Sequence, residues 1–133
     1  MRGLALLAAC AGLAGCAGLI SDGSRATAYL LPTRGNSASG SVSFTQSRDR
    51  LRVVADLSGL RPGHEHGFHI HEAGDCGSGD GESARGHFNP HAKPHGHYAL
   101  AARHAGDLPP LSADRQGRAR IDIELDLISV AQG

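Results

Sequence analysis

The chain has 133 residues, which is the size of one domain, and its 13 basic side chains balance 13 acidic ones. This zero net charge excludes a global basic field of the kind that attracts nucleic acid. Nineteen glycines, no tryptophan and short scattered apolar runs are typical of short strands joined by turns.

The first twenty residues, MRGLALLAACAGLAGCAGLI, differ from the rest of the chain. One positive charge, Arg2, precedes an uncharged stretch of small apolar residues, as in a secretory signal. The apolar run before the likely end of this signal is too short for a membrane-spanning helix. The stretch from Leu13 to Cys16, with sequence LAGC, resembles the bacterial lipobox, in which the cysteine becomes the lipidated first residue. A similar stretch ends at Cys10, but it leaves a very short hydrophobic region, so Cys16 is preferred.

These features predict three segments: a lipoprotein-type signal peptide in residues 1–15, a flexible tether in 16–24 and the folded domain in 25–133. We expect export to the bacterial periplasm or outer membrane, with membrane contact only through a lipid anchor at Cys16. An ordinary cleaved signal and a wrongly assigned start are the alternatives.

Apolar residues alternate with polar ones in several parts of the domain, which is typical of half-buried strands in an antiparallel sheet. In residues 50–60 the period-two positions are Leu51, Val53, Ala55 and Leu57. Near the end of the chain they are Ile121, Ile123, Leu125 and Leu127. The predicted strands are residues 25–33, 41–46, 50–60, 66–72 and 117–130.

Periodicity disappears between Ala73 and Leu111, where Gly, His, Pro and Asp are frequent. A loop this long inside a compact domain is more often functional than structural. It needs something other than an apolar core to order it, and a bound metal would serve.

The histidines support this hypothesis. All nine lie between residues 64 and 104, and strand periodicity predicts that His69 and His71 point to one face. This clustering favours metal binding over a solvated, histidine-rich loop. The nine are His64, His66, His69, His71, His87, His91, His95, His97 and His104.

Four stretches carry a more specific signal: HGFHIHEAGDC (66–76), GHFNP (86–90), HG (95–96) and RHAGDLP (103–109). In sequence and spacing they resemble the copper–zinc superoxide dismutases, over roughly residues 26–130. The resemblance implies an all-β fold, a Greek-key β-sandwich or barrel with a long metal-binding loop. It also implies copper and zinc as cofactors, superoxide as substrate, and dismutation of superoxide to oxygen and hydrogen peroxide.

The resemblance also implies a role for each matching residue. His69 and His71 match copper ligands, and His87 matches the imidazolate that bridges copper and zinc and exchanges a proton in catalysis. With His87, the residues His95, His104 and Asp107 match the zinc ligands, and a set of three histidines and one aspartate suits zinc. Imidazole also suits copper. His66 matches a neighbouring position that is not a ligand, and we expect His64, His91 and His97 to be solvated.

The match ends before the family pattern does. In the family a later strand carries a fourth copper histidine, followed by a cysteine, an arginine and the last strand. Here no histidine follows His104, no arginine follows Arg120 and no cysteine follows Cys76. Cys76 matches the family's loop cysteine, so its disulfide partner is absent from this sequence. We expect an incomplete sandwich that lacks its C-terminal strands and has marginal stability.

Three explanations stay open for this early end: a truncated gene product, a piece of a longer protein, or a shortened homologue. The last would be a non-catalytic, exported zinc- or copper-binding protein. A more remote alternative is a histidine-rich surface lipoprotein without a defined site. The sequence leaves a homodimer open.

Overall fold

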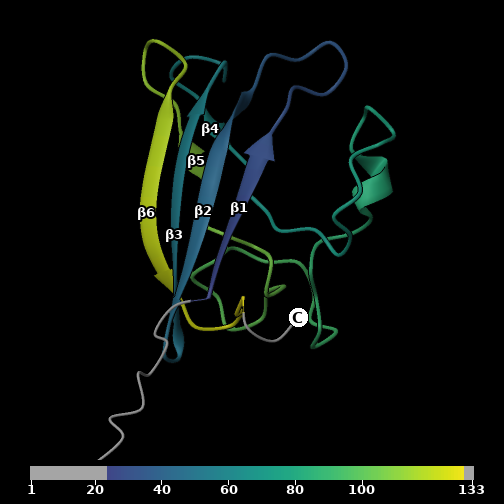
Figure 1. Cartoon of the computed structure of the whole chain (residues 1–133), viewed down its shortest axis with the longest axis vertical. Coiled ribbons are helices and arrows are strands. Elements are labelled where there is room, and N and C mark those ends of the chain that lie inside the picture. The colour runs from purple at the N-terminus through teal and green to yellow at the C-terminus, as the bar shows by residue number, and fades with distance from the viewer. Residues whose placement is uncertain (1–23, 131–133) are drawn as a thin grey trace, which may run out of the picture.

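The computed structural model describes residues 24–130. The prediction of an all-β fold is confirmed, because the described residues form antiparallel strands and a single 3₁₀ turn (Figure 1). The elements are β1 (Arg25–Leu30), β2 (Ser39–Ser47), β3 (Arg50–Ser58), β4 (Glu65–His66), η1 (Glu82–Ala84), β5 (Leu111–Ser112) and β6 (Ala119–Leu125). The predictions for residues 1–23, including lipidation of Cys16, lie outside the described residues.

The main sheet has the strand order β1-β2-β3-β6 and forms the left side of the molecule in Figure 1. The register places Val42 and Ile121 on either side of Ala55, so that the apolar residues of three strands share one face. On β3 this face is fully covered, and none of its four apolar side chains is more than 4% exposed. The alternation predicted for residues 50–60 is therefore confirmed.

A second, smaller layer covers the apolar face of the sheet. The two-stranded pair β4–β5 lies behind the main sheet in Figure 1. Phe68, Leu108 and Leu111 belong to the same buried cluster as the apolar residues of β3. The long segment 67–110 leaves the second layer after β4 and returns to it at β5. Between these strands, part of the segment extends on the side of the molecule opposite β6 (Figure 1).

Several predicted strands differ in extent from the observed ones: the first ends at Leu30, three residues early, and two others differ more. Residues 66–72 do not form one strand, because β4 ends at His66 and only isolated bridges follow, His69 with Asp107 and His71 with His87. The alternating residues find their partners inside the long loop and not in a neighbouring strand. The last strand ends at Leu125, so Leu127 leaves the sheet and is 40% exposed.

The segment after β6 crosses the end of the sheet. The Val130 N–H donates to Oε1 of Gln46, a nearly buried side chain of β2, at 3.2 Å. The Gln46 amide also donates to the Arg48 carbonyl of the β2–β3 turn at 2.9 Å.

None of the helical structure in residues 24–130 is long and apolar enough to cross a membrane.

Candidate metal centre

Three short extended segments position the site. The Phe88 N–H donates to the Ile70 carbonyl at 2.8 Å, the Gly106 N–H to the Phe88 carbonyl at 2.8 Å, and the Ile70 N–H to the Gly106 carbonyl at 3.0 Å. These bonds join three segments that are far apart in the sequence. The segments contain His69, His71, His87 and Asp107. Gly106 is required there, since a Cβ atom would lie 2.3 Å from the Ile70 carbonyl oxygen.

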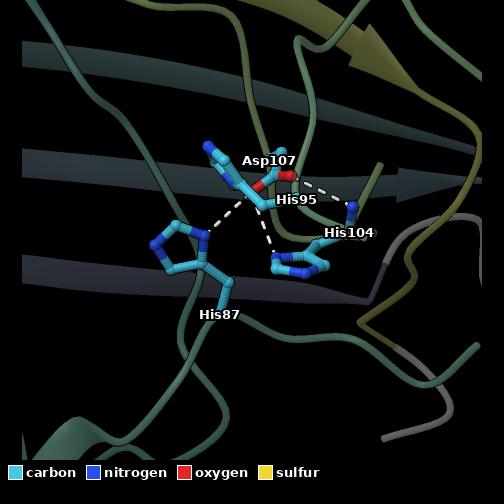
Figure 2. A group of neighbouring side chains, drawn as sticks. All are labelled: His87, His95, His104 and Asp107. Atoms are coloured by element: carbon cyan, nitrogen blue, oxygen red, sulfur yellow. Dashed lines mark hydrogen bonds and ion pairs between the residues drawn. The ribbon is translucent and has the colours of Figure 1, made fainter. Parts of the chain in front are cut away.

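Asp107 is the centre of the site and is only 3% exposed. Its Oδ1 lies 2.8 Å from Nδ1 of His87, 3.1 Å from Nδ1 of His95 and 3.5 Å from Nδ1 of His104 (Figure 2). Its Oδ2 accepts the Gly96 N–H at 3.2 Å and the His104 N–H at 3.0 Å. All three imidazoles therefore present the same ring nitrogen to one buried carboxylate.

These contacts change the acidity of Asp107. Burial alone would raise the pKa of its carboxyl group, because the interior disfavours charge. The hydrogen bonds from the Gly96 N–H, the His87 ring and the His104 N–H, together with the charge of His95, outweigh burial and lower the pKa to about 2. Asp107 is thus a carboxylate at any physiological pH.

The four side chains fit a metal cation. One ligand atom from each of His87, His95, His104 and Asp107 lies within 4.8 Å of the others. Nδ1 of His104 is buried and has no hydrogen-bond partner among the described residues. A buried, unpaired nitrogen aimed at a carboxylate is costly unless a further group satisfies it. Three imidazoles and one carboxylate are a ligand set that zinc accepts in tetrahedral geometry.

His69 and His71 lie beside His87 but do not belong to this four-residue group of the described chain. The His69 ring stacks on the His87 ring, with centroids 3.9 Å apart and an angle of 17° between the planes. The His71 ring meets His87 edge-on at 5.3 Å. Burial lowers the pKa of His69, and a charge on His87 lowers it further, so His69 tends to be neutral and able to bind a metal.

The other singled-out residues do not belong to the four-residue group of the described chain. Nε2 of His66 is 3.2 Å from the Arg61 carbonyl, as a structural role predicts. His64 and His91 are exposed, and the His97 ring packs 4.5 Å from Tyr98. Cys76 is exposed and forms no disulfide within the described residues.

Two backbone groups of the site have no signal in the sequence. The Gly96 N–H binds Asp107, and the Arg85 carbonyl lies 2.8 Å from Nδ1 of His71. A residue's identity does not show where its peptide group points, and an arginine gives no hint of the positive φ of 65° found at Arg85.

The comparison with known families agrees with this geometry. The profile of the family described as copper/zinc superoxide dismutase matches residues 38–133. The chain belongs to this family. Its members bind copper and zinc, and the resemblance of the four histidine-bearing stretches is thereby confirmed at the level of the family.

Relatives come from several kinds of organism. The Cu-Zn superoxide dismutase of Paramecium bursaria Chlorella virus 1 is 43% identical over 81 residues, 61% of this chain and 43% of the relative. Superoxide dismutase [Cu-Zn] 2 of the bacterium Aquifex aeolicus is 34% identical over 109 residues, 82% of this chain and 63% of the relative. The extracellular superoxide dismutase [Cu-Zn] of Caenorhabditis elegans is 37% identical over 120 residues, 87% of this chain and 53% of the relative. The chain spans about half the length of these relatives.

Proposed function

We propose that this chain carries the metal centre of a copper–zinc superoxide dismutase, which converts two superoxide ions and two protons into oxygen and hydrogen peroxide. The observation that supports it most is the convergence of His87, His95 and His104 on the buried Asp107, in a chain of this family. In this proposal these four residues hold zinc, and His69, His71 and His87 hold copper. Copper supplies the one-electron chemistry when it is bound.

His87 has the central role in this scheme. Its Nδ1 faces Asp107 at 2.8 Å, which leaves Nε2 as the nitrogen that can hold a proton and return it to the product. The stacked ring of His69 and the edge contact of His71 restrict the orientation of the His87 ring. His87 is therefore the catalytic residue that we propose.

The test is metal analysis of the purified chain combined with a superoxide-consumption assay. We expect bound zinc and copper and measurable dismutation. His87→Ala should lose both metals and the activity, because His87 belongs to both ligand sets. His64→Ala is the matched control, since His64 is exposed and lies outside the four-residue group. Intact zinc binding in His87→Ala would show that His87 is not a zinc ligand.

A second function has its own support. The four zinc-matching residues form a compact group, whereas His69 and His71 lie outside it in the described chain. This favours an exported zinc- or copper-binding protein without turnover. One tightly bound zinc, loosely held copper and no dismutation in the same experiment would select this alternative.

We also propose that the chain is exported as a bacterial lipoprotein anchored through Cys16. The charged Arg2 followed by small apolar residues supports export, as does the extracellular relative from C. elegans. Incorporation of a labelled fatty acid should be abolished by Cys16→Ser and retained in the control Cys10→Ser. Loss of label only in Cys10→Ser would move the anchor to that residue. Sedimentation of the purified domain tests whether it is a homodimer.

A further inference from the structure

Arg85 has an unusual backbone conformation beside the proposed copper ligands. Its φ is 65° and its ψ is −155°. This region of backbone space is essentially restricted to glycine, because a Cβ atom collides with the neighbouring peptide groups. A strained residue at such a place persists only when its surroundings hold it, and it often marks a functional site.

Hydrogen bonds on both sides hold Arg85 in this conformation. Its own N–H donates to the Glu82 carbonyl at 3.0 Å, which closes the turn η1. The carbonyls of Ala84 and Gly86 accept the N–H groups of Ala73 and Glu72 at 3.1 and 2.9 Å. The consecutive residues Glu72 and Ala73 thus bind the carbonyls of Gly86 and Ala84, which are two positions apart. Arg85 is therefore an additional residue in the segment that pairs with them, an arrangement similar to a β-bulge.

The bulge turns the Arg85 carbonyl away from this backbone pairing and toward His71. Its oxygen lies 2.8 Å from Nδ1 of the His71 ring. A carbonyl can only accept, so Nδ1 must carry the hydrogen, and Nε2 is then the nitrogen that can bind a metal. The His71 residue is exposed, which leaves little packing to fix its ring by other means.

We propose that Arg85 is a positioning residue for His71. The strained backbone at Arg85 holds a carbonyl that sets the tautomer and the orientation of the His71 ring, and it acts through the main chain and not through the guanidinium group. Partners of this kind typically change metal affinity 10- to 100-fold. The metal-binding role of His71 rests on the proposed function. The expected tautomer of the His71 ring does not depend on it.

The experiment uses the full chain with ¹⁵N-labelled histidine. In the metal-free protein, long-range ¹H–¹⁵N spectra should show His71 as a single tautomer protonated at Nδ1. Arg85→Gly permits the same φ and should keep this tautomer. Arg85→Pro fixes φ near −65° and removes the N–H that binds Glu82, so the two ring nitrogens should average. Arg85→Val disfavours the positive φ and keeps the N–H, which provides a second test if the proline variant does not fold.

Copper(II) titration gives the second readout. We expect binding at least about tenfold weaker in Arg85→Val or Arg85→Pro, and within about twofold of wild type in Arg85→Gly. Arg48→Val is the matched control, because Arg48 is an arginine with positive φ (53°) in the β2–β3 turn. It should leave the His71 spectrum unchanged.

Two outcomes would overturn the proposal: a single Nδ1-protonated tautomer in a folded Arg85→Val or Arg85→Pro variant, or its loss in Arg85→Gly. The second outcome would assign the effect to the guanidinium group. A normal tautomer response in a chain that neither binds copper nor consumes superoxide would reject the proposed function and leave the positioning role of Arg85 standing.

Discussion

The four-stranded sheet and the long loop 67–110 are ordered mainly by different forces, although Phe68 and Leu108 near the ends of the loop join the apolar core. In the sheet, the four apolar side chains on the inner face of β3 are at most 4% exposed, and every strand has a hydrogen-bonded neighbour. In the loop, the buried carboxylate of Asp107 lies among three imidazoles. Apolar burial stabilises the sheet without any ligand, whereas the loop gathers groups that a cation would hold together.

This difference predicts that the two regions respond to different changes. Loss of apolar volume should destabilise the whole domain through the sheet. Loss of a charged or polar ligand should weaken the loop and its metal affinity and leave the sheet folded. The following experiments test this separation, from the largest expected effect to the smallest.

Leu51→Ala should have the largest effect on stability. Leu51 is 2% exposed and pairs with Gln46 of β2 and Leu125 of β6. Removing its branched end leaves a cavity that the neighbouring strands cannot fill, at a cost of about 2–5 kcal/mol of unfolding free energy. Urea denaturation measures this cost. Leu31→Ala, at a residue that is 81% exposed, is the control and should cost much less. Equal costs would mean that the sheet is not the stabilising region.

Asp107→Asn should have the largest effect on the loop. The amide keeps the shape of the side chain but removes the charge that faces three imidazole nitrogens, so zinc affinity should fall by at least about 100-fold. Competition with a chromophoric chelator measures this loss. Asp126→Asn, at an exposed position, should leave the affinity unchanged. Amide protons of β2 and β3 should stay protected in both variants. Loss of that protection in Asp107→Asn would contradict the separation of the two regions.

The metal-free protein should lose stability in acid through Asp107. The pKa of this group is about 2 in the folded chain and 3.8 in the reference state. A lowered pKa means that the carboxylate stabilises the fold fully above pH 3.8, and that this contribution disappears as the pH falls toward 2. The contribution is about 2 kcal/mol. Unfolding curves of wild type and Asp107→Asn should therefore converge between these pH values. A constant difference would show that Asp107 does not titrate there.

Part of this organisation could be predicted from the sequence. The period of two in residues 50–60 identifies β3, because a strand with one buried face must alternate. The four histidine-bearing stretches identify the family by resemblance, and this resemblance implies that His87, His95, His104 and Asp107 belong to one set. Each of these residues has a side chain whose chemistry is visible in the sequence.

The remaining features depend on the backbone. The alternation of HGFHIHE suggests one strand, but β4 ends at His66, and His69 and His71 find partners at Asp107 and His87. Period-two alternation only shows that the backbone is extended, not which segment lies beside it. The Gly96 N–H and the Arg85 carbonyl are invisible for the same reason, since every residue has these groups.

Arg52→Ala should have the smallest effect. The Arg52 guanidinium donates from Nε and Nη2 to both oxygens of Asp122, at 2.8 and 2.6 Å, on the outer face of the sheet. Each group shifts the pKa of the other, upward for Arg52 and downward for Asp122, through this hydrogen bond and the charges. Both side chains are about half exposed, so water and salt screen the pair. We expect a change near the detection limit of urea denaturation that vanishes in about 1 M salt. Arg50→Ala, whose contact with Glu124 is longer at 3.6 Å, is the control and should change stability even less.

A large, salt-resistant loss in Arg52→Ala would mean that charge pairs stabilise both regions alike. The expected result would instead show that burial makes Asp107 important, because the same kind of carboxylate contributes little on the open face of the sheet.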